Sequence, residues 1–206
     1  MVQFIHHPAG STRLGDILND QLSRSDWTHF RAAVAFAKQS GVQHVREALA
    51  GFARRATVQL SVGIHLGGTS IEALNSLLDA LGPLGELWVC HNARGHTFHP
   101  KLYLFKNTEQ AVVIASSGNL TQGGLYTNYE ASLASELDLA TPADRHCLRE
   151  IEDVLDQWSS AAAGTAQQLT GALLAQLEAA HYLGPEAETP EIDEEPLPGT
   201  GQAQRA

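Results

Sequence analysis

Cysteine is scarce in this chain of 206 residues, which contains only Cys90 and Cys147. Two thiols are too few for a disulfide framework or for a zinc site built from thiolates. Both stand in apolar or helical contexts, where a free cysteine behaves as a small hydrophobic residue. We therefore expect two reduced, buried thiols and a cytoplasmic location.

Long hydrophobic runs are also missing, because no apolar stretch reaches the roughly 18 residues that span a bilayer. The first ten residues, MVQFIHHPAG, lack a basic region followed by an apolar one, so no signal peptide is expected. Hydrophobic residues make up 43% and charged residues 17%, which is typical of a globular protein in water. These features argue against a membrane partner.

Basic residues are outnumbered, since 13 Lys and Arg face 23 Asp and Glu and give a net charge of −10. The acids are unevenly distributed: residues 184–206 carry six acids and one base, which is half of the excess. Residues 91–106 contain no acid but hold Arg94 and His96. A local basic face, rather than total charge, decides contact with nucleic acid. Arg94 and His96 either line a substrate groove or belong to a solvated loop.

The apolar pattern switches between helical and strand periods along the first half of the chain. Apolar residues three or four apart predict helices, whereas alternating or short continuous runs predict strands. Strands that alternate with helices are typical of an α/β layer with mainly parallel strands. Helices are expected at 11–23, at 39–53 and from 71 to the Gly82-Pro83 pair, and strands at 27–37, 57–64 and 86–91.

The second half is hairpin-like and then helical. The polar segment KNTEQ predicts a turn between two strands. The expected strands are 99–105, 111–116 and about 129–135, and the expected helices are 142–159 and 165–182. The predicted fold is therefore α/β, a mixed and largely parallel central sheet flanked by helices on both faces, with C-terminal helices.

We divide the chain into three parts. Residues 1–160 form one domain, and residues 161–183 add a C-terminal helix that packs on the domain or on a partner. Residues 184–206 are rich in Pro, Glu, Gly and Thr, with almost nothing apolar. Such a segment cannot bury enough apolar surface to fold, so a disordered acidic tail is expected.

His99 and Lys101 stand two residues apart at the start of a predicted strand. Side chains alternate between the faces of a strand, so both face one side, about 7 Å apart at the backbone. Leu102 and Leu104 would be buried on the opposite face. A nucleophile and a cation on one face can both meet a phosphate group, although H-x-K alone is common by chance.

The segment after the next strand gives the pair its weight. Ser117, Asn119 and Thr121 lie in a polar loop beside Gly123-Gly124, and Glu130 follows. Hydroxyl and amide donors in a glycine-rich turn suit phosphate oxygens. Thr121 either caps the loop or binds phosphate, and the cap is favoured.

The ordered set H-x-K, S-x-N-L-T, G-G-L and N-x-E over residues 99–130 resembles the phospholipase D superfamily. It is most similar to the branch with one motif per chain, which includes metal-independent restriction endonucleases and helicase-associated nuclease domains. The resemblance implies that His99 forms a phosphohistidine and that Lys101 binds the non-bridging oxygens. It also implies that Ser117 and Asn119 bind phosphate and that Glu130 orients and polarises the histidine.

Two positions depart from the family pattern. The longer motif has an aspartate five residues after the lysine, where this chain has Lys106, and the glycine before the motif serine is Ser116. The nuclease branch often lacks that aspartate too. Nuclease activity is therefore expected to survive, and transfer chemistry on lipids is less expected.

The family active site needs two H-x-K motifs, since one histidine attacks and the other protonates the leaving oxygen. This chain has one, so the resemblance implies a homodimer with a composite site. His99 and Lys101 supply the nucleophile and the charge, so no metal and no cofactor is expected. A metal site at His91, His96 and His99 is disfavoured because no acid cluster accompanies it.

The expected function is cleavage of phosphodiester bonds in DNA, or in RNA, which the sequence does not distinguish. Residues 150–183 contain no Lys or Arg, so no base-reading element is apparent. We therefore expect a partner to target cleavage: a helicase, a translocase or another subunit of a restriction, anti-phage defence or repair system. The alternatives are a lipid phosphodiesterase and a non-catalytic module for dimerisation or DNA docking.

Overall fold

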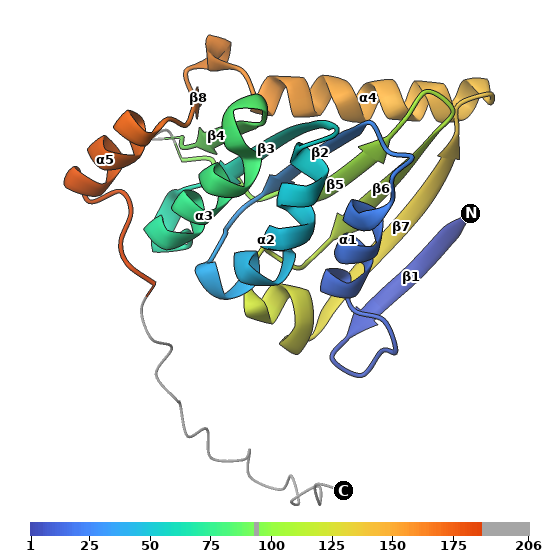
Figure 1. The fold of residues 1–206 in the computed structure, drawn as a ribbon, viewed down its shortest axis with the longest axis horizontal. Helices are drawn as coiled ribbons and strands as arrows, with labels where there is room; N and C mark the ends of the chain where they lie inside the picture. The colour runs from blue at the N-terminus through green and yellow to red at the C-terminus, as the bar shows by residue number, and fades with distance from the viewer. Residues whose placement is uncertain (93–94, 187–206) are drawn as a thin grey trace, which may run out of the picture.

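One sheet of eight strands forms the centre of the computed structural model, which describes residues 1–92 and 95–186. The strand order is β1-β7-β6-β5-β2-β3-β4-β8, and helices lie on both sides of the sheet (Figure 1). The strands are β1 (Val2–His7), β2 (His29–Val34), β3 (Thr57–Gly63), β4 (Glu86–Cys90), β5 (Lys101–Lys106), β6 (Gln110–Ser116), β7 (Glu130–Asp138) and β8 (Ala166–Gln168). The main helices are α1 (Leu14–Ser23), α2 (Gln39–Ala53), α3 (Ile71–Leu81), α4 (Pro142–Trp158) and α5 (Gly171–Ala179).

The α/β class, with a mixed sheet flanked by helices on both faces, is confirmed, but the sheet is not largely parallel. Among the described strands, β2–β3 and β3–β4 are parallel, whereas the other five pairings are antiparallel. Both parallel pairs come from the alternation β2-α2-β3-α3-β4, since a parallel pair needs a long crossover. The short turn between β5 and β6 permits only an antiparallel pair.

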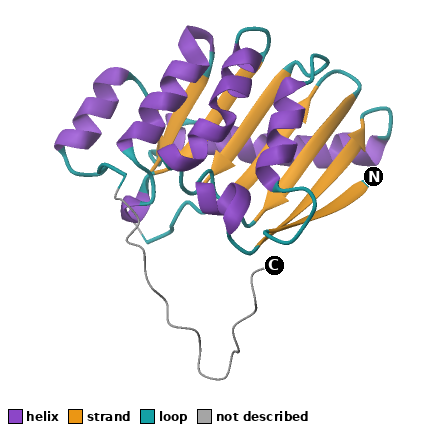
Figure 2. Ribbon diagram, turned by 60° about the horizontal axis from the view of Figure 1, so that its bottom comes forward, coloured by secondary structure: helices purple, strands orange, loops and turns teal. Residues whose placement is uncertain are grey.

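The two faces of the sheet carry separate hydrophobic cores. Helices α1, α2 and α3 bury their apolar stripes on one face, where Phe30 and Phe105 stack with ring centroids 4.4 Å apart. Helix α4 covers the other face with Leu148 and Leu155. Figure 2 shows the strands between these two helical layers. The cores fix the sheet rigidly, so the loops at its edges hold their side chains in defined places.

Two elements differ from the predictions. Strand β1 was not expected, because its outward residues Val2 and Phe4 are apolar, 66% and 63% exposed, and give no polar alternation. Residues 166–168 form the edge strand β8, so the helix predicted at 165–182 is wrong at its start. Helix α5 begins only at Gly171, where Thr170 Oγ1 accepts a hydrogen bond from Leu173 N at 3.2 Å.

The C-terminal segment is described only in part. Residues 187–206 lie outside the described residues, so the disordered acidic tail stays a prediction. Its first three residues, Gly184–Glu186, are described and contact the first turns of α2 and α3. No helix in the described ranges has both the length and the hydropathy that crossing a bilayer requires.

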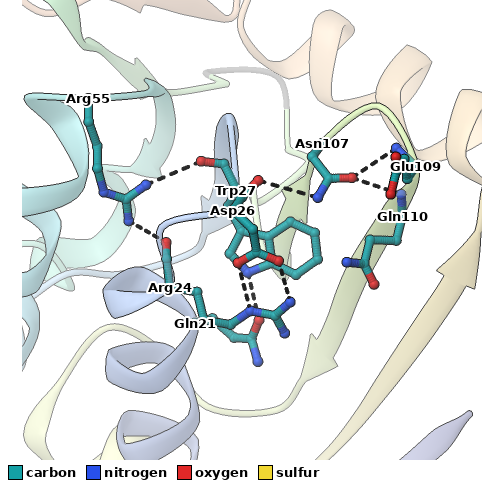
Figure 3. A network of polar contacts seen from close by, with 8 residues as sticks. All are labelled: Gln21, Arg24, Asp26, Trp27, Arg55, Asn107, Glu109 and Gln110. Atoms are coloured by element: carbon teal, nitrogen blue, oxygen red, sulfur yellow. Dashed lines mark hydrogen bonds and ion pairs between the residues drawn. The ribbon is translucent and has the colours of Figure 1, made fainter.

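A polar network closes the edge of the sheet where β2 begins and β5 ends (Figure 3). Arg55 donates to the carbonyl oxygens of Trp27, at 3.2 Å, and Leu22, at 2.9 Å. Arg24 pairs with Asp26 at 2.6 Å, and Asn107 Nδ2 donates to the Asp26 carbonyl at 3.3 Å. These two arginines therefore hold loops together at the edge opposite to the one where β5 begins.

The two cysteines differ in exposure, which gives a simple test of the fold. Burial raises the pKa of Cys90 to about 12, whereas Cys147 is exposed on α4, contrary to the expected burial. Because the thiolate is the reactive form, iodoacetamide should modify one thiol in the native protein and two in denaturant. Intact mass measures the count, and Cys147→Ser should abolish native labelling. Native labelling at both positions would contradict the buried position of Cys90.

Candidate active site

The residues singled out by the sequence motifs meet at one edge of the sheet. This edge contains the carboxyl ends of the parallel strands β2 and β3, and the antiparallel register adds the start of β5 there, with Lys101 opposite Val34. The end of β6 and the start of β7 lie at the same edge, because Ser116 pairs with Ser132. In open α/β sheets, ligands bind outside the carboxyl ends of the strands.

His99 and Lys101 are in direct contact. Lys101 Nζ lies 2.9 Å from Nδ1 and 3.0 Å from Nε2 of His99, so the amine sits against the ring. The ring of Phe36 stands edge-on to the imidazole at 5.9 Å. Burial lowers the pKa of Lys101, and the charge of Glu130 acts in the opposite direction. His99 itself is exposed and accessible to a ligand.

Ser117 and Glu130 form the second contact of the site. Ser117 Oγ donates to Glu130 Oε2, Asn128 Nδ2 donates to Glu130 Oε1 at 3.4 Å, and Ala131 N donates to Ser117 Oγ at 3.0 Å. Among the described residues, no hydrogen bond joins Glu130 to His99. The hydrogen bond to the histidine that the resemblance implied for Glu130 is therefore absent among the described residues, although the charge of Glu130 acts to raise the pKa of Lys101.

Asn119 is fixed by a backbone contact with the segment that follows β2. Its Oδ1 accepts from Phe36 N at 3.2 Å, while Leu120 N donates to Phe36 O at 3.1 Å and Lys38 N to Leu120 O at 3.0 Å. Nδ2 has no protein partner within the described residues and can donate to a ligand. A Cβ on Gly118 would stand 2.2 Å from Gly124 O, so this tight loop needs glycine there.

The remaining predicted site residues lie in different places. Thr121 Oγ1 accepts from Gly124 N at 3.0 Å, which is the capping contact favoured by the sequence. His96 is exposed and lies beside a hollow of about 230 Å³ that Phe98 and Trp158 also line. Arg94 lies outside the described residues.

Sequence reasoning missed two neighbours of the site. Tyr103 is fully buried beneath the loop, where its hydroxyl donates to Gly118 O at 3.5 Å, and burial raises its pKa. His7 is 2% exposed and is the cross-strand partner of Glu130. Neither ring nitrogen of His7 has a hydrogen-bond partner among the described residues. Alternation along the strand puts Tyr103 on the same face as Lys101, so the sequence could have indicated Tyr103. It could not have indicated His7, because no pattern predicted β1.

Metal ligands do not gather at this edge: across residues 1–92 and 95–186, no three His, Cys, Asp or Glu side chains converge as a metal site requires. The arrangement instead offers a nitrogen nucleophile, an amine against it, and hydroxyl and amide donors. Such donors can bind a tetrahedral anion with a partial negative charge on several oxygens.

No protein-family model matches the sequence, and no curated protein matches it. Solved structures do match. A phospholipase D family member, Nuc from Salmonella typhimurium, has a TM-score of 0.59 and 18% identity, over 83% of this chain and 99% of that one. NucT from Helicobacter pylori has a TM-score of 0.57 and 13% identity, over 82% of this chain and 99% of that one. Polyphosphate kinase from Porphyromonas gingivalis has a TM-score of 0.55 and 17% identity, over 79% of this chain and 27% of that one.

The fold is thus similar to that of Nuc, a phospholipase D family member, and to that of NucT. Within that fold, the chain carries one H-x-K motif, His99-Pro100-Lys101, at the sheet edge where the motif loop Ser117–Thr121 also lies.

Proposed function

We propose that this protein is a phosphodiesterase that cleaves DNA without a metal, through a phosphohistidine at a homodimer interface. The observation that carries the proposal is the contact of Lys101 Nζ with the ring of His99, beside Ser117 and Asn119. The similarity in fold to Nuc, a phospholipase D family member, supports it.

The proposed reaction has two steps. A ring nitrogen of His99 attacks phosphorus, and the bond from phosphorus to the leaving oxygen breaks as the partner subunit's His99 donates a proton to that oxygen. A water molecule then attacks the phosphohistidine and breaks the P–N bond. It gives its proton to the partner subunit's His99, which lost one in the first step. Lys101 and Asn119 Nδ2 stabilise the non-bridging oxygens, where negative charge increases. Ser117 Oγ, whose hydrogen bonds to Glu130 in the free protein, joins them by turning that hydrogen to the phosphate.

The direct test is incubation of end-labelled DNA and RNA strands with the protein in a chelator. Cleavage of either strand, with a phosphorylated histidine trapped by rapid acid-free quench and located at His99 by mass spectrometry, is the expected result. Hydrolysis of a phospholipid vesicle with no cleavage of nucleic acid would instead establish the lipid alternative. Binding of DNA without any cleavage would favour a docking module.

The dimer predicts a specific outcome when subunits are mixed. If each active site needs His99 from both chains, a heterodimer of wild type and His99→Ala is inactive. Equal amounts of the two proteins are unfolded together and refolded, so that subunits pair at random and about one quarter of the dimers are all wild type. About one quarter of the activity of a wild-type sample of the same total concentration should then remain. A remaining activity of one half would show that each chain works alone. Sedimentation or light scattering checks that the mass is twice that of one chain.

Asn119 permits a variant that separates binding from folding. Asn119→Asp keeps an oxygen acceptor for Phe36 N but removes the Nδ2 donor and adds a negative charge. We expect kcat to fall by about 10²-fold or more, as when one oxyanion donor is lost, with an unchanged Tm. Asn119→Ala, which also removes the acceptor, should in addition cost about 1 kcal/mol of stability. Equal loss of Tm in both variants would indicate a purely structural role.

Targeting by a partner completes the proposal. Helix α4 and the chain beyond it contain no Lys or Arg from residue 150 to residue 183, so that part of the surface cannot contact the DNA backbone strongly. We propose a helicase, a translocase or another defence or repair subunit as the source of specificity. Cleavage of random-sequence oligonucleotides by the isolated protein should then show no sequence preference, and a strong preference would contradict this part.

A further inference from the structure

The segment Gly184–Glu186 crosses the first turns of two helices at the active-site edge of the sheet. Ile71 N donates to Gly184 O at 3.2 Å, and Ser70 and Gly184 form a parallel bridge. Glu186 N donates to Glu72 Oε2 at 3.0 Å. Leu183, just before the segment, is 4% exposed in the main core and anchors it. We call Gly184–Glu186 the C-terminal strap.

The strap places a carboxylate on the amino terminus of α2. Glu186 Oε1 accepts from Ser40 N at 3.0 Å, and Oε2 accepts from Gln39 N and, at 3.1 Å, from Ser70 Oγ. Burial acts to raise the pKa of Glu186, but these hydrogen bonds outweigh it, so the pKa is lowered. Ser70 is fully buried, and its hydroxyl accepts from Gln39 N and Ala73 N, both at 3.3 Å, and donates to Glu186. The group held here is thus an anion from a residue 146 positions further along the chain than Ser40.

This anion lies close to the motif loop. Gln39 follows Lys38, whose backbone N–H donates to Leu120 O at 3.0 Å, and Leu120 follows Asn119. Two residue steps of about 3.8 Å and one backbone pairing of about 5 Å put Gln39 within about 13 Å of Asn119 at the Cα atoms. That distance corresponds to about two phosphates along an extended nucleic-acid strand, which is a separation that one bound strand can bridge.

We propose that the amides of Gln39 and Ser40 and the hydroxyl of Ser70 form a phosphate-binding position for the substrate strand, which the Glu186 carboxylate occupies until a phosphate displaces it. The inference rests on the proposed nuclease function and adds a second contact to it. The groups are backbone amides and a hydroxyl, which can donate to a carboxylate oxygen or to a phosphate oxygen.

The contacts also explain why the strap can be displaced. Glu186 is half-buried, and no described Lys, Arg or His side chain pairs with it. The Glu72 carboxylate lies next to the strap and accepts a hydrogen bond from the backbone N–H of Glu186. Its negative charge disfavours a second anion beside Glu186. Exchange of carboxylate for phosphate is therefore expected, rather than simultaneous binding of both.

Hydrogen–deuterium exchange of the full chain tests displacement directly. We would use His99→Ala, which binds without turnover, with and without a saturating single-stranded oligonucleotide whose binding is measured by fluorescence anisotropy. Exchange of the peptide that contains Gly184–Glu186 should rise several-fold on binding, while the peptide of Gln39 and Ser40 stays protected. A strap that stays protected while the oligonucleotide is bound would overturn the inference alone. No binding at all would contradict the proposed function and this inference together.

The second experiment changes the charge of Glu186 in the otherwise wild-type protein. Glu186→Gln weakens the competing group, so KM for the oligonucleotide should fall about three- to tenfold, as expected for loss of one carboxylate from a helix amino terminus, with kcat unchanged. The matched control Glu178→Gln removes the same charge from an exposed position on α5 and should leave KM unchanged. An unchanged KM with a lowered Tm in Glu186→Gln would mean that the strap is only a helix cap. If the strap is released when the oligonucleotide binds but the wild type never cleaves, the phosphate-binding position is supported and the catalytic proposal is contradicted.

Discussion

Replacement of His99 by alanine is expected to lower kcat for DNA cleavage by about 10⁴- to 10⁶-fold, the range seen when a catalytic nucleophile or its partner is removed. The side chain is exposed and contacts Lys101 and Phe36 without filling a core position. Its loss should therefore leave Tm within about 1 °C of wild type, since surface changes cost little. Single-turnover cleavage of a labelled strand in chelator measures the effect.

The matched control for this variant is His146→Ala. His146 is 66% exposed on α4, on the opposite face of the sheet from α1 to α3, so its removal should not alter the rate. His96→Ala is a third arm that tests a groove position: a raised KM with unchanged kcat is expected if His96 contacts the strand. Full activity of purified His99→Ala would contradict the phosphohistidine mechanism.

Replacement of Lys101 by methionine has the second largest expected effect. Methionine keeps the length of the apolar stem and removes the amine that lies 2.9 Å and 3.0 Å from the two ring nitrogens of His99. Loss of one charged stabiliser of the transition state is expected to lower kcat by about 10²- to 10³-fold. Lys101→Arg keeps the charge but changes its shape, so partial activity is expected.

The pH dependence distinguishes this role from a structural one. Because burial lowers the pKa of Lys101, the ammonium loses its proton below the ordinary lysine value of 10.5 as pH rises. Activity of the wild type should therefore fall on the alkaline side through that lowered pKa, and Lys101→Met should lack this fall. An identical alkaline profile in both proteins would show that Lys101 does not carry the charge.

The helices and most strands follow from local patterns. Helix α2 occupies the predicted range, Gln39–Ala53, because Val42, Val45 and Leu49 form one apolar stripe. Strand β8 was hidden because three residues beside an apolar helix give no period of their own, and β1 was hidden by its exposed apolar side chains. Edge strands take their conformation from the neighbour with which they pair, and no local pattern contains that neighbour.

Strand direction was another property that local sequence did not contain. The predicted alternation of strand and helix was right for β2 to β4, but β5, β6 and β7 reverse direction at each step. Those reversals bring the start of β5, the end of β6 and the start of β7 to the edge where β2 ends. Only this arrangement puts Lys101 near a loop that begins 16 residues later.

By itself, the sequence determined the class of the fold, the placement of His99 and Lys101 together at the start of β5 and the donor-rich loop from Ser117 to Thr121. These are local properties, set by alternation along a strand and by the chemistry of neighbouring residues. The predicted strand 99–105 was too long at its start, because β5 begins at Lys101 and His99 precedes it. Tertiary structure alone decided which groups meet: Ser117 with Glu130, Asn119 with Phe36 N, and Glu186 with the amino terminus of α2. The reason is physical, because contacts between residues far apart in the chain depend on strand order and on packing, which no short segment encodes.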